Sequence, residues 1–166
     1  SICFLFFLER IYLQEMKILD EPKTIRLKIM DFLARREYSS KEIYQKMSRR
    51  VEFREMLDDV IQQLVEDGLI SDARFAESYF QSRKNRGFGP LRIKNELKQK
   101  GINEGLFNEI QEGTEWSVLA LEVLEKKVKG KFPEEKKEVL KLKNFLNYRG
   151  FNFQHIDNAF SMIEIE

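Results

Sequence analysis

The chain has 166 residues, and its 29 lysines and arginines nearly balance its 28 aspartates and glutamates, for a formal net charge of +1. This balance excludes attraction to polyanions through overall basicity, so any such binding must come from local clusters. Hydrophobic residues make up 42% and charged residues 34% of the chain, as in a folded, soluble protein. Cys3 is the only cysteine, which excludes an intramolecular disulfide and fits the reducing cytoplasm.

The first residues differ from the rest of the chain. Residues 2–8 form an apolar run without a preceding basic residue. This run is too short to span a membrane, and it lacks the basic flank and the cleavage site of a secretory signal. We expect residues 1–23 to be an N-terminal leader that is disordered or not native. Within it, residues 1–15 are either dispensable or a strand of hydrophobic packing. Met16 is a candidate start of the folded protein.

Helical periodicity begins at about residue 24. Apolar residues over 25–33 recur at helical spacing and predict a first helix. Ser39, followed three residues later by Glu42, is typical of a capping box that opens a short second helix. A third helix is expected over about residues 52–67. These helices would form a first three-helix unit over residues 24–70.

The remaining sequence predicts two more units of three helices, over residues 71–112 and 113–166. Pro90 stands where the first turn of a helix tolerates proline, because that position has no intrahelical partner for an N–H. The expected turn residues are Gly87, Gly89, Pro90, Gly101 and Gly150. The predicted fold is therefore all-α, with about nine helices in tandem three-helix units that form an elongated array, straight or curved.

A short pattern recurs in the three units. An arginine, a turn, an aromatic residue and an isoleucine follow one another at the same spacing, beginning at Arg36, Arg86 and Arg149. Two of the turns have glycine after the arginine, and the first has Glu37. If Glu37 has a left-handed backbone, its strain is about 1 kcal/mol, and replacement by glycine should stabilise the protein slightly.

Basic residues concentrate around the central turn. Between Arg74 and Gly101 there are eight basic residues and only two acidic ones, Glu77 and Glu96, a local charge of +6. Arg92 can pair with Glu96 at helical spacing, whereas Lys94 and Lys98 are expected to share a face without acidic partners. The candidate partner- or DNA-binding residues are Arg74, Arg83, Lys84, Arg86, Arg92, Lys94, Lys98 and Lys100. Such a cluster suits phosphates or an acidic protein surface, although a solvated helix face would have the same composition.

Two further clusters give each unit a positive side. The candidate secondary residues are Arg35, Arg36, Lys46, Arg49 and Arg50 in the first unit, and Lys126, Lys127, Lys129, Lys141 and Lys143 in the third. A surface that follows a long polyanion would need such clusters along the whole chain.

Catalytic chemistry has little support in the sequence. His155 is the only histidine, so neither a histidine dyad nor a histidine-based zinc site can be built. The glycine-rich segment 87–90 lacks the Gly-Lys-Ser/Thr ending of a phosphate-binding loop and follows a helix rather than a strand. We therefore expect a binding protein without catalytic residues, metal or cofactor.

The central segment resembles the signature of the RecX family, the regulators of the bacterial recombinase RecA. The matching positions are Asp72, Arg74, Phe75, Ala76, Arg83, Arg86, Gly87, Gly89, Pro90, Ile93, Glu96, Leu97, Lys100, Gly101 and Ile102. The segments that begin at Phe32 and Phe145 resemble the flanking repeats of the family, so the resemblance covers about residues 24–163. Ser71 departs from the acidic residue that is usual there, and Glu37 from the glycine common at its position.

This resemblance implies a monomeric, cytoplasmic array of three-helix units without chemistry of its own. It would lie in the groove of the RecA filament and restrain filament growth, strand exchange and ATP hydrolysis, in contact with single- and double-stranded DNA. The alternative from the residues alone is a DNA-binding regulator of the helix-turn-helix type. It would need a recognition helix, for which the helix from Pro90 offers Arg92 and Asn95.

Overall fold

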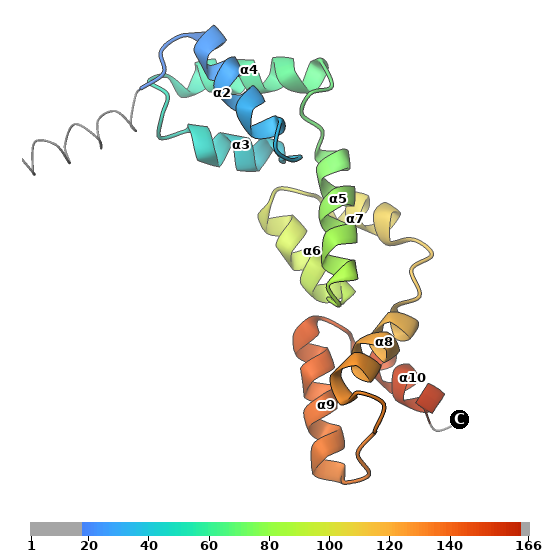
Figure 1. Ribbon diagram of the computed structural model, residues 1–166. Helices are drawn as coiled ribbons and strands as arrows, with labels where there is room; N and C mark the ends of the chain where they lie inside the picture. Colours follow the sequence, from blue (N-terminus) through green and yellow to red (C-terminus); the bar gives the residue numbers. More distant parts are fainter. Residues whose placement is uncertain (1–17, 164–166) are drawn as a thin grey trace, which may run out of the picture. The chain divides into compact units, whose positions relative to one another are not determined.

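The computed structural model describes residues 18–163, which form nine α-helices and no β-strand (Figure 1). This confirms the prediction of an all-α fold. The helices are α2 (Pro22–Leu33), α3 (Ser40–Met47), α4 (Arg54–Glu66), α5 (Asp72–Asn85), α6 (Pro90–Gln99), α7 (Glu104–Gln111), α8 (Trp116–Val128), α9 (Lys136–Arg149) and α10 (Phe153–Ile163).

The chain divides into two compact units, one up to Phe75 and one from Ala76 onward, so the division falls inside α5. The second of these units contains the third predicted group of helices and all of the second group except its first residues, 71–75. The elongated array and the three-unit division remain predictions.

In the first unit, α4 packs against both α2 and α3 around an apolar core that includes Ile25, Ile43 and Leu57. The predicted capping box is confirmed: the Ser39 hydroxyl accepts a hydrogen bond from the Glu42 N–H at 3.1 Å. The box fixes the start of α3, since it satisfies backbone donors that have no partner inside the helix.

The folded region begins inside the predicted leader. Leu19 is buried and forms an isolated β-bridge with Val51, in which the Leu19 N–H donates to the Arg50 carbonyl at 2.6 Å. Helix α2 starts soon afterwards, at Pro22. The part of the leader at residues 1–17, with Cys3 and Met16, lies outside the described residues.

The turn at Glu37 corrects one expectation. Lys129 is the only residue other than glycine with a positive φ in the range 18–163, so Glu37 is not left-handed. Its carbonyl accepts a hydrogen bond from Arg36, and its carboxylate accepts one from Arg74 Nε at 2.9 Å. Glycine at this position would relieve no strain and would remove a partner of Arg74, so the expected stabilisation is withdrawn.

The second unit is held together by a chain of aromatic rings. Phe80 on α5 contacts both Phe107 on α7 and Trp116 on α8, with ring centroids 6.2 and 5.7 Å apart. Trp116 in turn contacts Phe151, just before α10, at 6.5 Å. Because these contacts run without a break, they join α5, α7, α8 and the segment before α10 in one aromatic cluster.

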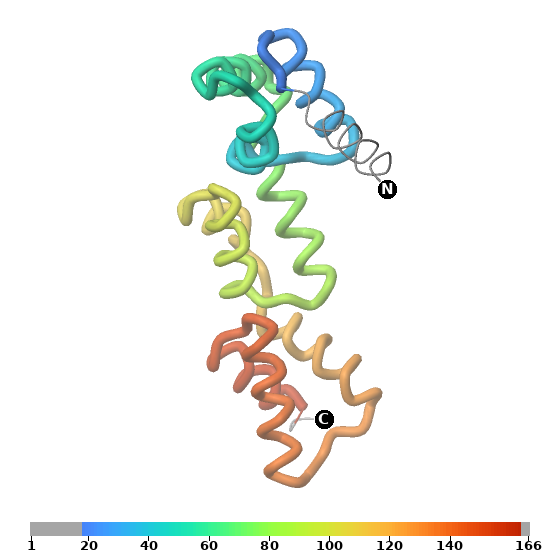
Figure 2. Tube along the Cα trace, turned by 90° about the vertical axis from the view of Figure 1, so that its left-hand side faces the viewer, coloured from blue at the N-terminus to red at the C-terminus, as the bar shows by residue number. Residues whose placement is uncertain are grey.

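Two turns of the second unit also touch directly through their backbones, where α5 leads into α6 and where α9 leads into α10 (Figure 2). The Gly89 N–H donates to the Arg149 carbonyl at 2.8 Å, and the Leu91 N–H donates to the Gly150 carbonyl at 3.0 Å. Pro90 is in the first turn of α6, as predicted. We call this contact the glycine joint; its residues are Gly89, Leu91, Arg149 and Gly150.

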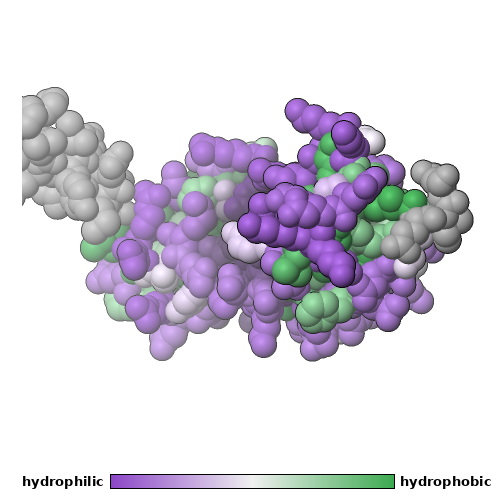
Figure 3. Space-filling model, turned by 90° about the horizontal axis from the view of Figure 1, so that it is seen from below, coloured by the Kyte–Doolittle hydropathy of each residue, from purple (hydrophilic) through white to green (hydrophobic). Residues whose placement is uncertain are grey.

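Polar and charged residues dominate the face shown in Figure 3, and the hydrophobic patches between them are small. None of the helices in the described part of the chain is both long and apolar enough to cross a lipid bilayer.

Candidate functional site

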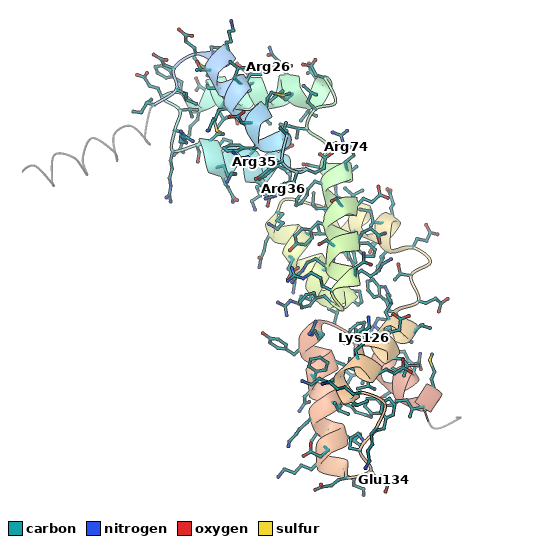
Figure 4. The ribbon with its side chains drawn as sticks, viewed as in Figure 1. Arg26, Arg35, Arg36, Arg74, Lys126 and Glu134 are labelled. Atoms are coloured by element: carbon teal, nitrogen blue, oxygen red, sulfur yellow. The ribbon has the colours of Figure 1, made fainter. Side chains whose placement is uncertain are left out.

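A cleft of about 570 Å³ in the second unit brings together basic residues from three helices and a turn. Its cations are Lys84 at the end of α5, Arg86 in the turn that follows, Lys126 and Lys127 on α8, and Arg149 on α9. Figure 4 labels Lys126. Among the residues that the structure describes, Glu122 is the only one that lines the cleft with a carboxylate. The apolar lining is provided by Leu119, Val123 and Phe145. We call this site the basic cleft.

Aromatic rings, rather than carboxylates, hold several of these cations. The Lys127 ammonium lies 4.9 Å from the Phe145 ring centroid, and the Arg149 guanidinium lies 5.1 Å from the same centroid. Arg149 also donates a hydrogen bond to the Arg86 carbonyl at 3.0 Å. Among residues 18–163, none of the five cations of the basic cleft forms an ion pair. Their charge is therefore available to a negatively charged ligand.

Glu96 on α6 binds two of the predicted site residues, Arg83 and Arg92, in an internal network of hydrogen bonds. Its carboxylate accepts hydrogen bonds from Arg83 Nε and Nη2, both at 2.7 Å, and from Arg92 Nε at 3.0 Å. The Tyr79 hydroxyl donates a fourth bond at 2.9 Å. The predicted pair between Arg92 and Glu96 is confirmed, and the network joins α5 to α6.

The electrostatics of this network favour the charged forms of its members. Partial burial raises the pKa of Glu96, but the hydrogen bonds from Arg83, Arg92 and Tyr79 outweigh it and hold the pKa below the usual 4.5. The hydrogen bond to Glu96 raises the pKa of Arg83 despite partial burial. The side chain of Arg83 is only 15% exposed, so we infer a structural role for it and not a binding role.

We expect Glu96→Gln to lower the free energy of unfolding by about 2 kcal/mol at pH 7, because charge-assisted hydrogen bonds to two guanidinium groups are lost. Since the folded pKa is depressed, this stabilisation is complete above the unfolded pKa and is lost as the pH falls through the folded pKa. Urea unfolding between about pH 7 and pH 3 should therefore show the wild type and the variant converging as the pH falls. A gap that stays constant over this range would contradict the assignment.

Lys94 was expected to have no acidic partner, and this expectation is wrong. Its ammonium forms an ion pair with Glu104 at the start of α7, and this contact lowers the pKa of Glu104. Glu104 follows ten residues after Lys94, beyond the helical spacing considered in the sequence. Lys98 is exposed and forms no ion pair with the residues that the structure describes. Lys100 lies 5.3 Å from the Tyr79 ring centroid.

Arg74 lies in the first unit, where internal contacts occupy it. Besides the bond to Glu37, its guanidinium donates to the Gly68 carbonyl at 2.8 Å. It therefore ties the start of α5 to the end of α4 and to the turn before α3.

A second basic surface lies in the first unit, where Lys46, Arg49 and Arg50 line a cleft of about 690 Å³. The Arg36 guanidinium lies 3.5 Å from the Tyr38 ring centroid and forms an ion pair with Glu42 at 3.1 Å. Arg35 is exposed at the turn after α2 (Figure 4). The predicted cluster is thus partly neutralised at Arg36.

The third predicted cluster does not form one site. Lys126 and Lys127 line the basic cleft, whereas Lys141 pairs with Glu138 at 2.6 Å and Lys143 pairs with Asp157 at 3.2 Å. Lys129 ends α8 in a left-handed conformation. The fold therefore unites Lys84 and Arg86 of the primary cluster with two residues of the secondary one, and it adds Arg149, which was not among the predicted site residues. The recurring arginine pattern was the signal that could have indicated Arg149.

His155 and Asn152 form two hydrogen bonds with each other at the start of α10. The Asn152 side chain accepts a hydrogen bond from the His155 N–H at 2.8 Å, and the His155 ring accepts one from the Asn152 N–H at 3.4 Å. Burial lowers the pKa of His155. No group of three or more metal-ligating side chains occurs within the range 18–163.

These features define an all-α protein of two compact units, the second of which has a positively charged cleft. The family model described as "RecX, second three-helix domain" matches residues 71–109. The curated protein "Regulatory protein RecX" of Pseudomonas entomophila (strain L48) is 35% identical over 146 residues, which cover 87% of this chain and 94% of that protein. The protein of the same name from Halorhodospira halophila is also 35% identical, over 82% of this chain and 86% of its own. The chain therefore belongs to the RecX family.

Solved structures show the same fold. The crystal structure of RecX from Lactobacillus salivarius matches with a TM-score of 0.72 at 22% identity, covering 87% of this chain and 97% of that one. A second crystal structure, of "regulatory protein RecX", matches with a TM-score of 0.71, again at 22% identity, and covers 72% of that chain.

Proposed function

We propose that this protein is a non-enzymatic regulator that binds the RecA–DNA filament and inhibits filament extension, strand exchange and ATP hydrolysis. Membership of a family of regulatory proteins supports a regulator. The observation that carries the choice of a negatively charged partner is the basic cleft, with five cations and one carboxylate. A role in DNA repair and recombination and in the SOS response, in the cytoplasm and as a monomer without a cofactor, belongs to the same proposal.

The distribution of ion pairs divides the predicted residues into two roles. Arg83, Arg92 and Glu96 join α5 to α6, and Arg74 holds the start of α5. The cations of the basic cleft are those that we expect to bind phosphates or acidic side chains of the filament. A polyanion that enters the cleft relieves the repulsion among these cations and, where it is DNA, releases counterions into the solvent.

The alternative, a sequence-specific regulator of the helix-turn-helix type, loses support from the same contacts. Its recognition helix would be α6, with Arg92 and Asn95 as readers of base edges. Arg92 is bound to Glu96 and lies 4.4 Å from the Phe88 ring centroid. Glu96 occupies the Nε donor of Arg92, so only its Nη groups remain for guanine, and the internal network sets their direction.

Capture by immobilised filaments tests the proposal. We expect recombinase filaments assembled on single-stranded DNA to retain the protein at salt concentrations at which the same DNA without recombinase releases it. The reason is that filament protein and DNA would provide contacts together. Recombinase ATP hydrolysis, measured in parallel, should fall as the protein is added. Equal retention by both supports, with unchanged ATP hydrolysis, would contradict the proposed function.

A further inference from the structure

Tyr148, near the end of α9, presents an aromatic ring to solvent, since this residue is 76% exposed. The ring is nevertheless positioned: the Arg92 guanidinium lies 5.5 Å from its centroid. Arg92 is itself fixed, because it donates to Glu96 and lies 4.4 Å from the Phe88 ring centroid. A structural network therefore holds an exposed ring, and most of the residue's surface remains open to a ligand.

The surroundings of Tyr148 combine a small apolar surface with nearby positive charge. Leu91 is 50% exposed and belongs to the glycine joint, where its N–H bonds to the Gly150 carbonyl, two residues after Tyr148. Phe145 and Arg149, one turn apart on α9, both line the basic cleft. Tyr148 precedes Arg149 directly and lies three residues after Phe145, so it borders the helix face that lines the cleft.

Exposed aromatic rings beside cationic grooves are the usual binding sites for unpaired bases, because every base has a flat face that can stack on the ring. We propose that Tyr148 stacks on an unpaired base of a single-stranded nucleic acid whose phosphates occupy the basic cleft. This inference rests on the proposed function in that both use the cations of the cleft. It adds a contact to the base itself, which lysines and arginines facing phosphates do not provide.

Affinity for oligonucleotides with and without bases tests the stacking contact. The probes are a labelled oligodeoxythymidine and an abasic oligomer of the same length and phosphate count, with binding followed by fluorescence anisotropy at low salt. We expect Tyr148→Ala to weaken binding of the oligodeoxythymidine about tenfold and to leave binding of the abasic oligomer unchanged. Tyr148→Phe keeps the ring and should bind both probes as the wild type does. Phe153→Ala removes another aromatic side chain, 77% exposed, and should have no effect.

A spectroscopic variant measures the contact directly. In Tyr148→Trp, the new tryptophan should be quenched by the oligodeoxythymidine and not by the abasic oligomer. Trp116 is buried, at 8% exposed, and its signal is subtracted with the wild-type protein. Quenching by both probes to the same extent, or by neither, would refute stacking.

Three other results would overturn the inference: unchanged affinity of Tyr148→Ala for the oligodeoxythymidine, an equal loss for both probes, or no binding of either probe by the wild type. If Tyr148→Ala loses capture by recombinase filaments but keeps its affinity for the oligodeoxythymidine, Tyr148 contacts filament protein and not a base. All of these outcomes leave the proposed function standing as long as filaments retain the wild-type protein.

Discussion

Gly89→Ala is expected to destabilise the second unit by at least about 2 kcal/mol, because a new side chain would be forced into a packed contact. A Cβ atom at Gly89 would lie 2.4 Å from the Gly150 carbonyl carbon and 2.5 Å from the Phe151 nitrogen. Both are backbone atoms, so no side-chain rotation can make room. Gly89 has a φ of −89°, which alanine adopts readily, and the cost therefore comes from the glycine joint and not from local strain.

Urea unfolding followed by circular dichroism measures this effect, and Gly105→Ala is the matched control. Gly105 lies in α7, and a Cβ there would meet only the Asn103 side-chain oxygen, at 3.3 Å. Alanine in a helix is favoured over glycine by about 0.5–1 kcal/mol, so the control should be neutral or slightly more stable. If Gly89→Ala had the same midpoint of urea unfolding as the wild type, the two turns would not be in contact.

The double substitution Lys126→Glu with Lys127→Glu is expected to weaken capture by recombinase filaments more than tenfold, because it places two negative charges in the basic cleft. For single-stranded DNA alone, losing two phosphate contacts should reduce the slope of log K against log salt by about 1.4. Helix content should not change, since both side chains are exposed.

A control with the same change in charge separates this site from overall electrostatics. Lys136 and Lys137 are exposed at the start of α9 and do not line the basic cleft. They follow Glu134, which Figure 4 shows at the loop that leads into α9. Lys136→Glu with Lys137→Glu should retain most of the binding and inhibition. If both double variants lose binding equally, net charge governs the interaction and the basic cleft has no special role.

The features that sequence reasoning predicted correctly depend on neighbours in the chain. The capping box of Ser39 and Glu42, the first-turn position of Pro90 and the pair between Arg92 and Glu96 each involve residues within four positions of one another. At such short range, the geometry of a helix alone decides which groups meet.

The features that sequence reasoning missed depend on how the helices pack. Arg83 reaches Glu96 across 13 positions, and Lys94 reaches Glu104 across ten. Counting charges along the sequence from Arg74 to Gly101 therefore overestimated the positive charge that is available on α5 and α6. The basic cleft has the same origin, because Arg149 lies 63 positions from Arg86 and meets it only through the contact of two turns.

The aromatic chain of the second unit has a practical consequence. Trp116 is the only tryptophan in the sequence, and it contacts rings from both α5 and the segment before α10. Its intrinsic emission is an optical probe of how these helices pack, and the portion of the chain up to Phe75 contributes no tryptophan signal. Emission and total helix content, recorded in one titration, would reveal whether the two units melt together or in sequence.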